Sequence, residues 1–135
     1  MNQILVAVDG HPHASKVVDA AIQVAKSMSA RILLVFVIKE NPKDGFKSAE
    51  SYDEDQYLRT TGPLMEKIKG SNVDVEEVWG GGDPKRFILK TAKDQGVSMI
   101  VMGIHPRKNI GKIRAIGDVA RNVVESSKVP VLVVP

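Results

Sequence analysis

The chain has 135 residues and a formal net charge of +3, so we expect one domain spanning residues 1–135. Hydrophobic residues make up 43% and aromatic residues only 4%, which predicts an aliphatic core. The absence of cysteine excludes a disulfide framework, a thiolate metal site and a cysteine nucleophile. It also fits a reducing compartment, and since no secretory pattern is visible we expect a cytoplasmic protein. No apolar run approaches the roughly 20 residues of a membrane helix, and the mild charge does not favour nucleic acid.

The first third of the chain alternates between strand-like and helix-like patterns. Ile4–Val8 is a short apolar run typical of a strand covered on both faces, and it ends at the turn signal Asp9–Gly10. Apolar residues then recur at helical spacing over Ala14–Met28. Residues 32–38 predict a second buried strand, and the polar residues 39–51 predict a surface loop.

The middle of the chain is less regular. Residues 52–69 have helical composition, but Gly62–Pro63 interrupts them and predicts two helical pieces or a kink. The valines of residues 73–78 indicate a third strand, which is less apolar than the others and therefore expected at an edge. Gly80–Gly82 is expected to form a flexible turn.

The last third completes the alternation of strands and helices. Asp83–Pro84 predicts an N-cap followed by proline at the first position of a helix that stops near Gly96. Met99–Met102 and residues 131–134 read as two further apolar strands. Between them a final helix is expected to turn three valines inward: Val119, Val123 and Val124. Because helices separate the strands, we predict a doubly wound α/β fold with a five-stranded parallel sheet and helices on both faces.

Five segments in register resemble the universal stress protein family. They are Ile4–Gly10, Leu33–Ile38, Gly82–Pro84, Ile100–Gly103 and Val129–Val134, and together they span almost the whole chain. The resemblance implies a Rossmann-like sheet of the adenine nucleotide alpha hydrolase type, with strand order 3-2-1-4-5. It also implies homodimers formed largely through the last strands. In one branch of the family an adenine nucleotide such as ATP or AMP is bound at the switch between strands 1 and 4, and another branch lacks nucleotide binding.

The glycine motif that separates the two branches is altered in this chain. Its first glycine is Gly103, but Pro106 holds the second position, Gly117 lies one residue too far along, and Asp118 replaces a hydroxyl residue. Proline offers no N–H to a phosphate. An ionised aspartate only accepts hydrogen bonds, so it repels a phosphate unless a cation lies between them.

A basic loop supplies positive charge that favours phosphate despite these changes in the motif. It carries four cations within eight positions: Arg107, Lys108, Lys112 and Arg114. Arginine binds phosphate through two parallel hydrogen bonds and lysine neutralises its charge. A bound Mg²⁺ would also make Asp118 favourable to a nucleotide. A solvated surface loop is the alternative interpretation, and without aromatic residues the loop is a poor platform for nucleic acid.

The resemblance and the predicted switch point together give a set of candidate nucleotide-binding residues. They are Ala7, Val8, Asp9, Val37, Met102, Gly103, His105, Arg107, Gly117, Asp118 and Val119. By resemblance Asp9 contacts adenine or ribose, although an aspartate here is equally a turn residue or helix cap. By resemblance Val37 contributes backbone to the adenine pocket, and its side chain is core under either interpretation.

Other chemistry receives less support. His11, His13 and His105 follow neighbouring strands and would share one crevice, but no carboxylate or cysteine spacing supports a metal site there. Ser15 and Thr60 lack a base and an orienting partner, so we expect no enzyme, with at most slow, incidental ATP hydrolysis.

Two functions therefore remain open. One is a homodimeric stress-response protein that binds an adenine nucleotide, and the other is a dimeric regulatory partner that has lost nucleotide binding. In both, antiparallel pairing of residues 131–134 with a second copy would close an exposed sheet edge.

Overall fold

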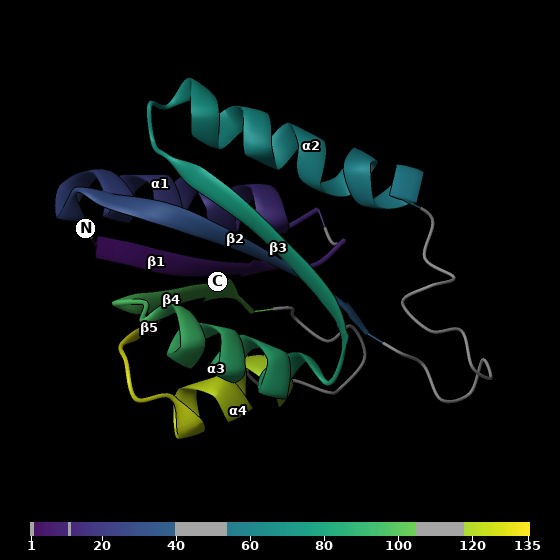
Figure 1. The fold of residues 1–135 in the computed structure, drawn as a ribbon, viewed down its shortest axis with the longest axis vertical. Coiled ribbons are helices and arrows are strands. Elements are labelled where there is room, and N and C mark those ends of the chain that lie inside the picture. The colour runs from purple at the N-terminus through teal and green to yellow at the C-terminus, as the bar shows by residue number, and fades with distance from the viewer. Residues whose placement is uncertain (1, 11, 40–53, 105–117) are drawn as a thin grey trace.

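The computed structural model describes residues 2–10, 12–39, 54–104 and 118–135, in which strands and helices alternate strictly (Figure 1). The strands are β1 (Asn2–Val8), β2 (Ala30–Lys39), β3 (Val75–Gly82), β4 (Met99–Gly103) and β5 (Val131–Val134). The helices are α1 (Ala14–Met28), α2 (Glu54–Gly70), α3 (Pro84–Gln95) and α4 (Asp118–Ser126). This order confirms the predicted alternation. Lys39 ends β2, and the rest of the loop predicted for residues 39–51 lies outside the described residues.

The sheet has the strand order β3-β2-β1-β4-β5, and every neighbouring pair is parallel. In the middle of the sheet Val6 of β1 lies opposite Leu34 of β2 on one side and Val101 of β4 on the other. The order that the resemblance implied is therefore confirmed. Because all strands are parallel, their carboxyl ends lie along the same edge of the sheet.

Two helices cover each face of the sheet: α1 and α2 lie on one side, and α3 and α4 on the other (Figure 1). Successive residues of β1 alternate between these layers. Ile4 and Val6 pack in the cluster beneath α1 and α2, whereas Leu5 packs in the cluster beneath α3 and α4, and all three are fully buried. Burial on both faces explains why β1 is a continuous apolar run rather than an alternating one.

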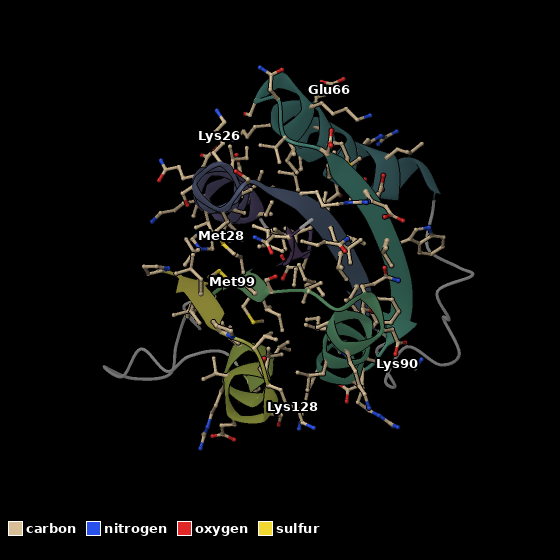
Figure 2. All side chains as sticks on the ribbon, turned by 60° about the vertical axis from the view of Figure 1, so that its left-hand side comes forward. Lys26, Met28, Glu66, Lys90, Met99 and Lys128 are labelled. Atoms are coloured by element: carbon tan, nitrogen blue, oxygen red, sulfur yellow. The ribbon has the colours of Figure 1, made fainter. Side chains whose placement is uncertain are left out.

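The helices are amphipathic. In Figure 2 the charged side chains of Lys26, Lys90 and Lys128 project outward, whereas Met28 and Met99 are half-buried and pack against the cluster on the α1 face. Within the described part of the chain, no helix is both long enough and apolar enough to cross a membrane.

Both edges of the sheet are less buried than its centre. Among the described strands β3 pairs with β2 alone, and it carries Trp79, the one tryptophan of the sequence, whose side chain is 52% exposed. At the other edge of the described sheet β5 pairs with β4 and exposes Leu132. The prediction that the third strand lies at an edge is confirmed.

Helix α2 continues through Gly62 and Pro63, so of the two predicted alternatives the division into two helical pieces is wrong, whereas the kink stays a prediction. Three residues around this point are buried on one side of the helix: Thr61, Leu64 and Ile68. Proline inside a helix costs about 3 kcal/mol. Burial of each large aliphatic side chain contributes about 1.5–3 kcal/mol, so packing on the sheet layer offsets the cost of Pro63.

The prediction of a flexible turn at Gly80–Gly82 is also wrong, because these glycines are the last residues of β3. A side chain at Gly80 would overlap the ring of Phe87, which packs from α3 against this strand. Gly82 has φ +102°, a conformation that side-chain-bearing residues rarely adopt, and it leads the chain from the strand into α3. Gly80 therefore allows close packing against α3, and Gly82 allows the backbone conformation in which the chain leaves β3.

The termini of α3 are as the sequence predicts. The carboxylate of Asp83 accepts a hydrogen bond from the backbone N–H of Lys85 at 3.2 Å, and Pro84 occupies the first helical position. Gly96 ends the helix in the left-handed conformation with φ 61°. These caps fix where α3 begins relative to the end of β3.

The inner face of α4 is rotated from the one predicted. Ala120 and Val123 are buried and Val119 is half-buried, as a helix packed on the sheet requires. Val124 is 45% exposed, so its assignment to the inner face is wrong. Adjacent helical positions lie about 100° apart, so Val123 and Val124 cannot both point at the core.

Candidate functional site

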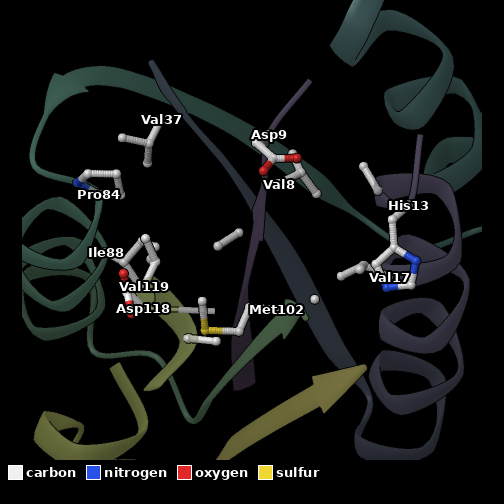
Figure 3. A pocket seen from close by; sticks show the side chains of 14 residues that line it. Val8, Asp9, His13, Val17, Val37, Pro84, Ile88, Met102, Asp118 and Val119 are labelled. Carbon is white, nitrogen blue, oxygen red and sulfur yellow. The ribbon is translucent and has the colours of Figure 1, made fainter. Parts of the chain in front are cut away.

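A cavity of about 300 Å³ opens at the carboxyl edge of the sheet (Figure 3). Its floor is formed by the ends of β1, β2 and β4, and its walls by the first turns of α1, α3 and α4. The position follows from the topology. The helix that follows β1 lies on one face of the sheet, whereas the helix that follows β4 lies on the other, so the strand order reverses its direction at this point.

Aliphatic side chains form most of the cavity wall. Val37 comes from β2, Met102 from β4, Pro84 and Ile88 from α3, and Val119 from α4. Ile88 and Met102 are buried, so they are held in place by the core behind them. Walls of this kind suit the faces of a flat ring, which gains dispersion and hydrophobic contact there.

Two carboxylates border this apolar space. Asp9 directly follows β1, and Asp118 is the first residue of α4; both are exposed, and both line the cavity (Figure 3). Carboxylate oxygens accept hydrogen bonds, so these residues can hold hydroxyl or amino groups of a ligand, or a cation. Among the described lining residues, these two aspartates are the acidic ones.

His13 connects the cavity to the last strand. Its Nε2 lies 3.1 Å from the carbonyl oxygen of Val134, and because a carbonyl only accepts, Nε2 donates this hydrogen bond. The same oxygen accepts the backbone N–H of Ile104 at 3.0 Å. The imidazole therefore lies over the junction where β4 ends beside β5.

Gly103 is required by this arrangement. A Cβ at Gly103 would lie 2.8 Å from Cγ2 of Val17 and 2.9 Å from Cδ2 of His13, closer than such atoms approach in proteins. The first turn of α1 can therefore lie directly on the end of β4 only because residue 103 has no side chain. Close packing therefore explains the glycine at position 103 independently of any role in ligand binding.

Three helices begin at the cavity. Ala14 of α1, Pro84 of α3 and Asp118 of α4 are the first residues of their helices, and all three line it. Helix N-termini carry partial positive charge from unpaired N–H groups. At α1 the N-cap position is His13, which makes no side-chain capping bond, whereas α3 is capped by Asp83. The described wall thus combines positive helix ends with two negative side chains.

Of the candidate residues named from the sequence, eight lie together in this cavity: Ala7, Val8, Asp9, Val37, Met102, Gly103, Asp118 and Val119. His105, Arg107 and Gly117 lie outside the described residues, as do Pro106 and the rest of the basic loop. Whether these residues bind a ligand remains a prediction.

Six further lining residues were not on that list: His13, Ala14, Val17, Pro84, Ile88 and Ala120. Four of them, Ala14, Val17, Pro84 and Ala120, belong to first turns of helices that follow a strand, and Ile88 begins the second turn of α3. The sixth, His13, occupies the N-cap position of α1. The predicted helix starts could have identified them, because a first turn after a parallel strand faces the same sheet edge. His13 does reach the crevice suggested for the histidines, whereas His11 and His105 are not described. In residues 2–10, 12–39, 54–104 and 118–135, no three His, Cys, Asp or Glu side chains are grouped as metal ligands.

The strand order, with a cavity at its switch point, is that of a doubly wound α/β protein. The chain belongs to the universal stress protein family, whose sequence profile matches residues 1–135.

Individual relatives agree with this assignment. Universal stress protein YxiE of Bacillus subtilis strain 168 is 29% identical over 146 aligned positions, which cover 98% of each chain. The universal stress protein from Archaeoglobus fulgidus in complex with dAMP superposes with a TM-score of 0.76 at 20% identity, covering 100% of this chain and 98% of that one. A universal stress protein in complex with cAMP superposes with a TM-score of 0.74 at 22% identity, covering 99% and 97%. At these identities the structures establish the shared fold.

Proposed function

We propose that this universal stress protein binds an adenine nucleotide in the cavity between β1 and β4. The observation that carries the proposal is the cavity itself, about 300 Å³ in volume, with apolar walls and two carboxylates at the switch point of the sheet. This volume is at the lower end of the range of small-molecule sites. The dAMP and cAMP complexes of two proteins with the same fold support the choice of ligand.

The residues suit the parts of a nucleotide differently. The adenine ring packs among Val37, Ile88 and Met102, since aliphatic walls favour the faces of a purine. Asp9, at the end of β1, accepts a hydrogen bond from the adenine amino group or from a ribose hydroxyl. The phosphates extend toward Gly103 and the start of α4, where the helix dipole favours negative charge. Mg²⁺, if present, is held between the phosphates and Asp118.

Calorimetric titration with ATP, ADP, AMP, dAMP and cAMP, each with and without Mg²⁺, tests the proposal. At least one of them should bind, and the Val37→Phe variant should weaken binding about tenfold or more because its ring fills the space for adenine. Val124→Phe is the matched control, since Val124 is exposed on α4 and does not line the cavity. Absence of heat and of a thermal shift at millimolar ligand would reject nucleotide binding.

We infer that the protein acts by binding rather than by catalysis, because the described lining of the cavity contains no serine, threonine, cysteine or lysine that could serve as a nucleophile. We also expect a cytoplasmic homodimer that pairs through Val131–Val134. β5 is an edge strand with Leu132 exposed, and two-fold antiparallel pairing would cover it. Light scattering should give the mass of a dimer, and the Leu132→Lys variant should shift it towards the monomer.

A second candidate is a dimeric regulatory partner that binds no nucleotide. It is favoured by the charged side chains of the described wall, Asp9 and Asp118, which are both acidic and so repel phosphate. Mass spectrometry of small molecules released from freshly purified, denatured protein distinguishes the two. Nucleotide in stoichiometric amount would exclude this second function.

A further inference from the structure

Two hydrogen bonds hold the end of the last strand next to the cavity. The carbonyl oxygen of Val134 accepts one from Nε2 of His13 at 3.1 Å and one from the backbone N–H of Ile104 at 3.0 Å. Val134 is the last residue of β5, a strand of four residues that pairs with β4 alone among the described strands. A short edge strand opens more readily than a central one because fewer contacts hold it. These two bonds, together with the buried side chain of Val134, therefore keep the end of β5 in place.

The imidazole of His13 lies between close packing on one side and the cavity on the other. A Cβ at Gly103 would lie 2.9 Å from Cδ2 of His13 and 2.8 Å from Cγ2 of Val17, so both side chains pack on the backbone at the end of β4. Figure 3 shows them next to each other on the wall that α1 forms, and both line the cavity. Movement of the ring away from Val134 therefore takes it into the cavity, because the side towards β4 is filled.

We propose that His13 couples ligand binding in the cavity to the order of β5: a bound ligand holds the imidazole against the carbonyl of Val134 and so stabilises the edge strand. The inference rests on the proposed function, because it assumes an adenine nucleotide in the cavity. The ligand distinguishes two states, the ring bonded to Val134 and the ring turned into the space that the ligand fills. By linkage, ordering of β5 strengthens ligand binding by the same factor. Since β5 is the strand expected to pair with a second copy, the coupling connects ligand binding to assembly.

The hydrogen bond between His13 and Val134 sets the upper limit of the coupling. A protein hydrogen bond contributes about 1 kcal/mol, which corresponds to about a fivefold change in an equilibrium constant. A ligand that only keeps this bond closed therefore slows the opening of the end of β5 by up to about fivefold. The amide of Ile104 reports this opening directly, because its N–H bonds to the same carbonyl oxygen.

Native-state hydrogen exchange followed by NMR tests the coupling. The exchange rate of the Ile104 amide is measured without ligand and with AMP, or with ATP and Mg²⁺ where AMP does not bind, at the same multiple of the dissociation constant that calorimetry gives for each protein. The nucleotide should slow this exchange in the wild type by up to about fivefold more than in His13→Ala. His13→Gln should retain part of the difference, since a side-chain amide also donates a hydrogen bond.

The chain offers a matched control at the other end of β5. The hydroxyl of Ser127 donates to the carbonyl oxygen of Val129 at 2.8 Å and accepts the N–H of Val129 at 3.1 Å, so it holds the chain just before the strand. Ser127 is not among the described residues that line the cavity. Ser127→Ala should leave the protection by the nucleotide as in the wild type. If Ser127→Ala lost as much protection as His13→Ala, the effect would be one of general strand stability and the proposal would be overturned.

The outcomes separate this inference from the proposed function. If a nucleotide binds but slows the exchange of Ile104 equally in the wild type and in His13→Ala, or not at all in the wild type, the coupling is refuted and nucleotide binding stands. If neither AMP nor ATP with Mg²⁺ binds to the wild type, both are refuted. Far-UV circular dichroism establishes that each variant is folded. His13→Leu, which also lacks a donor but fills more of the same space, replaces His13→Ala if the alanine variant is unfolded.

Discussion

Replacement of Gly103 by alanine tests the packing at the centre of the site. The added Cβ would lie 2.8 Å from Cγ2 of Val17 and 2.9 Å from Cδ2 of His13. Neither neighbour can move freely, because Val17 is buried and β-branched and the His13 ring is hydrogen-bonded to Val134. The backbone of α1 or the end of β4 must therefore shift.

The size of the effect follows from two opposing contributions. Overpacking of a well-filled region costs about 1–3 kcal/mol. Replacing glycine by alanine returns about 0.4–1 kcal/mol by restricting the unfolded chain. We expect a net loss of about 1–2 kcal/mol. For 135 residues the unfolding entropy is about 0.28 kcal/mol/K, so Tm should fall by about 4–7 °C.

Thermal unfolding followed by far-UV circular dichroism measures this change. Gly70→Ala is the control: nothing lies within 4 Å of a Cβ there, and alanine favours the end of α2, so Tm should stay the same or rise. In a Val17→Ala background the Gly103→Ala change should cost less, because one of the two close contacts has been removed. A Gly103→Ala protein as stable as the wild type would refute the reasoning and leave ligand binding as the remaining reason for this glycine.

Three further substitutions probe the elements around the site by the same assay. Gly80→Ala should destabilise by about 1–3 kcal/mol because its Cβ overlaps the ring of Phe87, and a Phe87→Ala background should remove most of that cost; equal costs in both backgrounds would contradict this packing. His13→Ala should cost about 1 kcal/mol, the value of the hydrogen bond to Val134, and an unchanged Tm would show that this bond contributes nothing. Asp83→Ala should lower stability by about 1 kcal/mol through loss of the helix cap, whereas Asp83→Ser should not, and equal melting of the two variants would argue against capping.

Local patterns were sufficient to predict the alternation of strands and helices. Ile4–Val8 is apolar throughout because it is covered on both faces, and Asp83 and Gly96 bracket α3 through capping chemistry that depends only on neighbouring residues. The order of the strands came from the family resemblance, since residues within a strand do not specify which strand lies beside it. The structure confirms both.

Two of the incorrect predictions share a physical cause. Pro63 and Gly80–Gly82 were interpreted from their local preferences, but tertiary packing decides their conformation. Leu64 and Ile68 hold α2 together around the proline, and the ring of Phe87 explains why β3 contains a glycine where a turn was expected. The intrinsic propensity of a residue is a weak determinant of local backbone conformation where the packing of buried side chains favours another conformation.

The sequence predicted the residues of the candidate site that lie at the ends of strands, but it did not predict those at the starts of α1 and α3. Asp9 and Met102 follow from the position of the switch point. Pro84 and Ile88 were recognised as helix residues, but their place in the cavity depends on how α3 lies across the sheet, which sequence spacing does not give. The contact of His13 with Val134 joins residues 121 positions apart, so no local pattern could have revealed it.

The exposed position of Trp79 has a practical consequence for studying this protein. As the sequence has one tryptophan, and its indole is already half in water on the edge strand, intrinsic fluorescence should emit at long wavelength in the native state. Unfolding then changes the surroundings of the fluorophore little, although the aliphatic interior is lost entirely. A small change in emission would therefore be a property of one side chain, and should not be mistaken for a weakly cooperative transition.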